Sequence, residues 1–186
     1  MGDENIGWKT KFWLSFVVIM VVVVAIVSSQ TDTSTDKNIT HPHNVYTHTY
    51  YVGVDGHKIA LYHNPNATDI TYDQVIKFIK QDETDQIPYS DSTFTCGEYA
   101  ENVQHNAENA GIRCGWVEIL FVTAERHSCN VFNTTDRGLV FIDCTCADSI
   151  IPINTNTIYQ QYRPIALDPN KSIDPLPYIQ DYEIYW

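Results

Sequence analysis

The stretch TCGEYAENVQHNAENAG, residues 95–111, predicts a helix that begins at a cysteine. Thr95 and Glu98 have the spacing of a capping box, in which each side chain satisfies a backbone N–H of the other residue. Small or apolar residues then recur every three or four positions, and Gly111 suits the left-handed position that follows a helix. Cys96 therefore falls in the first helical turn, where unpaired N–H groups and the positive end of the helix dipole stabilise a thiolate.

Three extended segments are predicted after this helix, at residues 113–122, 127–132 and 139–145. They are rich in β-branched and aromatic residues, and a polar turn separates the last two, which indicates an antiparallel meander. Side chains alternate between the faces of a strand, so His127 and Asp143 can face each other from neighbouring strands. We therefore expect an α+β domain in which the Cys96 helix packs on an antiparallel sheet.

Cys96, His127 and Asp143 have the chemistry of a catalytic triad. A carboxylate beside His127 would fix the imidazole tautomer, and the other ring nitrogen would accept the thiol proton. His105 is a poor alternative base, because nine residues of helix, about 900° of rotation, turn it away from Cys96. The alternative interpretation is purely structural. It treats Cys96 as a small buried side chain, His127 as a hydrogen-bonded strand residue and Asp143 as an acid that caps a turn.

At these residues the sequence resembles the transglutaminase-like superfamily. The resemblance covers residues 72–145 and lies in four short blocks: Cys96-Gly97-Glu98-Tyr99-Ala100, Ala110-Gly111-Ile112-Arg113, His127-Ser128-Cys129-Asn130 and Ile142-Asp143-Cys144-Thr145. It implies a papain-like α+β core with Cys96, His127 and Asp143 as the catalytic residues. Cys129 stands where the family often has an aromatic residue and Cys144 where it often has proline. Tyr89 is a candidate for the second oxyanion donor.

The remaining chain adds a hairpin, a helix and an irregular end. Residues 45–54 and 57–62 flank the turn dipeptide Asp55-Gly56, and residues 71–74 have a capping-box pattern that opens a helix to about residue 82. Prolines interrupt the chain beyond residue 145, where one last strand is expected within 158–167. The aromatic C-terminus is expected to pack across the domain.

The N-terminus carries the clearest organisational signal. An apolar run at residues 12–27 follows Lys9 and Lys11, and a helix over residues 8–29 would be about 33 Å long, enough to cross a bilayer. We expect a cytoplasmic segment at residues 1–11, a transmembrane signal-anchor at 12–29, a flexible polar linker at 30–44 and an extracytoplasmic domain at 45–186. A signal peptide cleaved before Gln30 is the alternative.

Composition limits the partners of the exported domain. A net charge of −12 over 186 residues argues against nucleic acid, because phosphate binding depends on Lys and Arg. Glycosylation sequons begin at Asn38, Asn66, Asn133 and Asn170 and suit an extracellular glycoprotein. The partners expected are the cell membrane and a peptide or protein amide substrate, with no cofactor and no metal.

Four further cysteines have no assigned role: Cys114, Cys129, Cys144 and Cys146. Two disulfides are arithmetically possible. Strand alternation would put Cys144 and Cys146 on one face, where they could hold a soft metal or pair with Cys114, although structural zinc sites favour wider spacing. The sequence leaves these alternatives open.

Two functions fit the pattern. The first is a cysteine peptidase or amidase that acts through a thioacyl intermediate. The second is a catalytically inactive surface module that keeps the same fold for binding or structure.

Overall fold

The computed structural model describes residues 46–157 and 159–186, with side chains from Tyr51 onward. The expected cytoplasmic segment, transmembrane helix and linker lie outside the described residues. Within the described part of the chain, no helix is long and apolar enough to cross a membrane.

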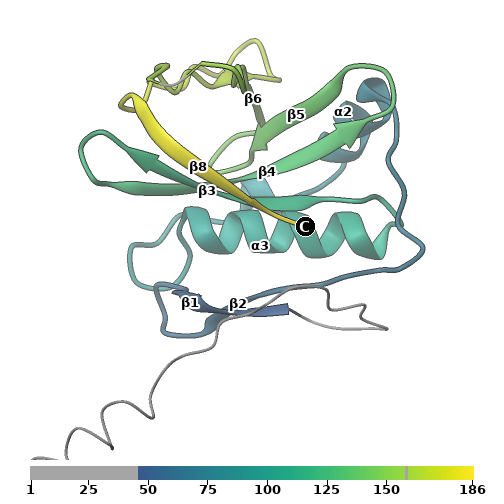
Figure 1. The fold of residues 1–186 in the computed structure, drawn as a ribbon, viewed down its shortest axis with the longest axis horizontal. Coiled ribbons are helices and arrows are strands. Elements are labelled where there is room, and N and C mark those ends of the chain that lie inside the picture. The colour runs from purple at the N-terminus through teal and green to yellow at the C-terminus, as the bar shows by residue number, and fades with distance from the viewer. Residues whose placement is uncertain (1–45, 158) are drawn as a thin grey trace, which may run out of the picture. The chain divides into compact units, whose positions relative to one another are not determined.

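Helices and antiparallel strands form an α+β architecture (Figure 1). The helices are α2 (Tyr72–Ile79), the short 3-10 helix η1 (Thr84–Gln86) and α3 (Cys96–Asn109). The strands are β1 (Tyr46–Val52), β2 (Lys58–Leu61), β3 (Gly115–Phe121), β4 (Arg126–Thr134), β5 (Gly138–Asp143), β6 (Ser149–Ile151), β7 (Ile165–Ala166) and β8 (Ile179–Tyr185). β1 and β2 form a separate hairpin, and the other six strands form one sheet in the order β7-β6-β5-β4-β3-β8.

The large sheet has an apolar cluster on each face. On one face, α2 and α3 contribute Val75, Val103 and Ala107, which pack with Phe132 and Ile142. On the other face, side chains of β3, β4 and β5 pack with Tyr162 and Ile179 from the C-terminal part of the chain. α3 is therefore covered by the large sheet on one side and by the β1–β2 hairpin on the other (Figure 1).

The hairpin is attached to α3 by a ladder of side-chain to backbone hydrogen bonds. Its four acceptors are buried polar side chains spaced three or four residues apart, Glu98, Glu101, Gln104 and Glu108. They accept from the backbone N–H groups of Val54 (2.7 Å), Ala60 (2.6 Å), Tyr62 (3.0 Å) and Asn64 (2.9 Å), respectively. A second stripe of α3, which is polar, thus accepts hydrogen bonds from backbone N–H groups along the edge of the hairpin, which the large sheet does not reach.

Glu108 also joins the hairpin to the large sheet. Its Oε2 accepts from Asn64 N–H, while its Oε1 accepts from Cys114 N–H at 2.9 Å, one residue before β3. The carboxylate is 3% exposed, so it replaces water for both donors.

Local signals in the sequence correctly predicted the elements around the site. The capping boxes at Thr71 and Thr95 are both present, and Gly111 has a φ of 79° directly after α3. The hairpin turns at Gly56, whose φ is 90°. α2 is shorter than expected, because it ends at Ile79 and η1 follows.

The C-terminal part was predicted less well. The expected strand within residues 158–167 is reduced to the two residues of β7, and Ile158 lies outside the described residues. β6 and β8 were not predicted as strands. β8 pairs with β3 from Phe121↔Ile179 to Trp116↔Tyr185, so the aromatic end packs along the sheet edge.

Candidate active site

Cys96 is the first residue of α3 and is held at the end of the large sheet. Glu98 Oε2 accepts from Thr95 N–H at 2.7 Å, which fixes the chain just before the cysteine. The N–H of Cys96 belongs to the first helical turn and has no acceptor within the helix. The thiol is partly exposed, unlike the buried thiols of Cys114, Cys129 and Cys144.

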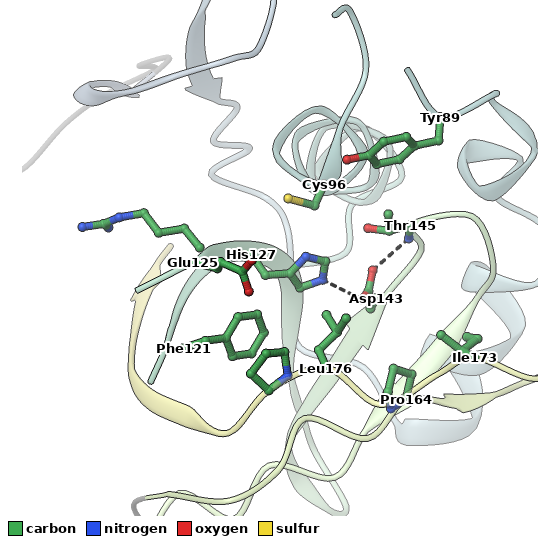
Figure 2. A pocket seen from close by; sticks show the side chains of 12 residues that line it. Tyr89, Cys96, Phe121, Glu125, His127, Asp143, Thr145, Pro164, Ile173 and Leu176 are labelled. Atoms are coloured by element: carbon green, nitrogen blue, oxygen red, sulfur yellow. Dashed lines mark hydrogen bonds and ion pairs between the residues drawn. The ribbon is translucent and has the colours of Figure 1, made fainter. Parts of the chain in front are cut away.

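His127 and Asp143 meet on the sheet face that α3 does not cover. His127 Nε2 lies 2.8 Å from Asp143 Oδ2, and both side chains are less than one tenth exposed. Asp143 has two further donors: Thr145 N–H reaches Oδ1 at 2.8 Å, and the Tyr162 hydroxyl reaches Oδ2 at 2.7 Å. Because Nε2 faces the carboxylate, Nδ1 is the nitrogen left for Cys96 (Figure 2).

The three groups shift one another's pKa values in the directions that favour their charged forms. Burial alone would raise the pKa of Cys96, but a hydrogen bond and the charge of His127 lower it below the ordinary thiol value. Burial alone would lower the pKa of His127, but Asp143 and Cys96 raise it to about 10. Burial opposes the charge of Asp143, but His127 and the Thr145 amide lower its pKa. The arrangement therefore favours a thiolate beside an imidazolium.

All three residues line one open pocket of about 390 Å³. Its other lining residues are Tyr89, Phe121, Glu125, Arg126, Thr145, Pro164, Ile173, Leu176 and Pro177. Figure 2 shows the Tyr89 hydroxyl directed toward the Cys96 side of the pocket. Cys96 is thus open to a ligand and is not sealed in the core.

Tyr162 and Phe121 belong to the site and were missed in the sequence. The Tyr162 ring is fully buried and lies edge-on to His127 at a centroid distance of 5.2 Å, and the Phe121 ring stacks on His127 at 6.3 Å. The alternation of β3 could have indicated Phe121. Tyr162 lies among prolines in an irregular segment, where no periodicity indicates which side chains point inward.

His105, which helical rotation excluded as the base, is not at the site, since its Nε2 contacts the Ala60 carbonyl oxygen on the hairpin side of α3. This position agrees with the helical rotation argument. His127 is the histidine that the fold brings to Cys96.

The expectation that Cys144 and Cys146 share a strand face was wrong. β5 ends at Asp143, and Cys146 is exposed with a φ of 64°, whereas Cys144 is buried in the cluster between the sheet and the helices. Strand alternation does not apply beyond the end of the strand. All five cysteines are free thiols, so neither possible disulfide is formed.

One cluster of metal-binding side chains lies away from the pocket, beneath the hairpin turn. Ligand atoms of Asp55, His57 and Glu98 lie within 4.8 Å of one another. Each of the three residues already has a hydrogen-bond partner. His57 N–H donates to Asp55 Oδ1 at 3.0 Å, Val54 N–H donates to Glu98 Oε1 at 2.7 Å, and His57 Nε2 lies 2.8 Å from Glu101 Oε2. The cluster therefore holds the hairpin on α3.

Comparisons of the chain with family models, curated proteins and solved structures gave no match.

Proposed function

We propose that this protein is a cysteine-dependent amide hydrolase, a peptidase or amidase, with Cys96 as nucleophile, His127 as general base and acid, and Asp143 as the group that orients His127. One observation carries the proposal. A partly exposed cysteine at a helix N-terminus shares one open pocket with a buried histidine whose Nε2 lies 2.8 Å from a buried carboxylate, and that histidine lowers the pKa of the cysteine.

The chemistry follows from these positions. The Cys96 thiolate attacks the amide carbonyl carbon, and the carbonyl π electrons move to oxygen. The imidazolium of His127 then gives its proton to the amine as the C–N bond breaks, which leaves a thioester. His127 then takes a proton from water as the water oxygen attacks the thioester carbonyl carbon. The C–S bond breaks with its electron pair going to sulfur, which releases the carboxylic acid and restores the Cys96 thiolate beside the His127 imidazolium.

The tetrahedral oxyanion needs hydrogen-bond donors close to Cys96. The Cys96 N–H at the start of α3 supplies one, aided by the helix dipole. We assign the Tyr89 hydroxyl as the second donor, because Tyr89 lines the same pocket with its hydroxyl toward Cys96 (Figure 2).

The proposal includes the transglutaminase-like core and an exported location. The order of a cysteine-bearing helix followed by histidine and aspartate on adjacent antiparallel strands supports the former. The apolar run at residues 12–27 after two lysines supports a single membrane anchor with the domain outside the cytoplasm.

The first test is the pH dependence of Cys96 alkylation by iodoacetamide. The folded pKa of Cys96 is lowered, so the rate should reach its plateau below the pH at which an ordinary thiol ionises. In His127→Ala, burial still raises the pKa of Cys96, but the opposing effect of His127 is lost. The alkylation rate at neutral pH should therefore fall at least about tenfold, the equivalent of one pKa unit. Identical profiles in the two proteins would contradict the mechanism.

The second test is cleavage of a peptide library by wild type and Cys96→Ala. Cleavage should occur in wild type and disappear in the variant. Persistence in Cys96→Ala would reject this nucleophile, and absence from both proteins would favour the non-catalytic surface module.

A further inference from the structure

One wall of the pocket is apolar and is built by segments that are distant in sequence. Phe121 comes from the end of β3, and Pro164, Ile173, Leu176 and Pro177 come from the C-terminal part of the chain. Figure 2 shows the labelled residues of this wall, Phe121, Pro164, Ile173 and Leu176, on the opposite side of the His127 ring from Cys96. A ligand joined to the Cys96 sulfur can therefore extend past the imidazole onto apolar surface.

The wall is fixed before any ligand binds. Leu176 N–H donates to the Tyr162 carbonyl at 3.0 Å, and Ile179 N–H donates to the Gln160 carbonyl at 2.8 Å, so two stretches of the segment hold each other. Leu176 packs on the buried cluster beneath it yet remains partly exposed and lines the pocket. Its position is thus set by the core, while one side remains available for a ligand.

The charges around this wall disfavour an anion. The guanidinium of Arg126 pairs with buried Glu118 on the α3 face of the sheet, so this cation already has an anionic partner. Glu125 also lines the pocket, and no ion pair to it occurs among the described residues. A carboxylate on the ligand would lose hydration against the apolar wall and meet the negative charge of Glu125.

We propose that this wall is the specificity subsite: it takes an uncharged apolar side chain of the amide substrate next to the scissile carbonyl and rejects an acidic one. The inference rests on the proposed hydrolase function, because it assigns the substrate of the same pocket. The substrate class is a peptide with an aliphatic or aromatic residue at that position.

Two matched covalent probes test the subsite on the full chain. N-acetyl-leucine chloromethyl ketone and its aspartate counterpart both alkylate a thiolate, which forms a C–S bond as chloride leaves. Iodoacetamide, which has no side chain, is the reference on each protein, so a partly unfolded fraction cancels in the ratio. Wild type should react with the leucine probe at least about tenfold faster than with the aspartate probe, which is the discrimination that an apolar pocket typically provides.

Leu176→Ala should lower the ratio of the leucine-probe rate to the iodoacetamide rate at least about threefold, since part of the wall is removed. Ile165→Ala is the matched control, because Ile165 is an exposed apolar residue that does not line the pocket, and its ratios should equal those of wild type. Equal rates for both ketones, with rapid His127-dependent alkylation by iodoacetamide, would overturn the subsite and leave the hydrolase proposal standing. Slow iodoacetamide alkylation that His127→Ala does not change would remove both.

Discussion

Two side chains, His127 and Tyr162, contact the same carboxylate oxygen of Asp143. His127 Nε2 and the Tyr162 hydroxyl both contact Oδ2, while the Tyr162 ring also lies edge-on to the imidazole. A buried carboxylate with several donors stays ionised, and its pKa is indeed lowered. Tyr162 is therefore a positioning residue that acts on Cys96 only through Asp143 and His127.

Tyr162→Phe should shift the acid side of the activity profile to higher pH, because Asp143 loses a donor that stabilises its charge. A hydrogen bond to a charged group contributes about 1.5–3 kcal/mol, so an upward shift on the order of one pH unit is expected. The measurement is the pH dependence of Cys96 alkylation together with urea unfolding. Tyr182→Phe is the control, since Tyr182 packs against Phe141 on the same sheet face and has no contact with Asp143. A loss of stability with an unchanged pH profile would show a structural role only.

At the scale of elements, α3 presents two buried stripes with different tasks. Its apolar stripe packs on the sheet, and its polar stripe binds the backbone of the hairpin. The apolar stripe could be predicted from its spacing. The polar stripe could not, because Glu and Gln on a helix are usually solvated and nothing local indicates that an extended segment some 40 residues earlier will cover them.

The ladder predicts a large effect at Glu108. Glu108→Ala would leave the N–H groups of half-buried Asn64 and buried Cys114 without their acceptor, and each lost partner costs about 1–3 kcal/mol. The expected loss of unfolding free energy for the two groups together is therefore about 2–6 kcal/mol, measured by urea denaturation. Asn109→Ala, one residue later on an exposed position of the same helix, should change stability by less than about 0.5 kcal/mol. Similar values for the two variants would contradict the assigned role of the ladder.

For the whole molecule, the sequence identified the parts of the site that depend on local rules. A capping box positions Cys96, and strand alternation turns His127 and Asp143 to one face. The position of Tyr162 and the pairing of β8 with β3 depend on contacts between distant segments. Neither segment alone specifies the register of such contacts. The pocket wall belongs to this second class, so the proposed substrate preference could not be predicted from the sequence alone.

The proposed topology can be tested with the chain's own thiols. Cys146 is exposed and Cys96 is partly exposed, whereas Cys114, Cys129 and Cys144 are buried. If residues from about Gln30 onward lie outside the cytoplasm, a membrane-impermeant maleimide added to intact cells should label Cys146, and Cys96 where the reagent fits the pocket. Cys146→Ser should remove most of this label, and denaturant should expose the three remaining thiols. Labelling of Cys146 that requires cell lysis would contradict export of the domain.

Recovery of a mature N-terminus at Gln30 would instead show cleavage of a signal peptide, with export retained and the anchor lost.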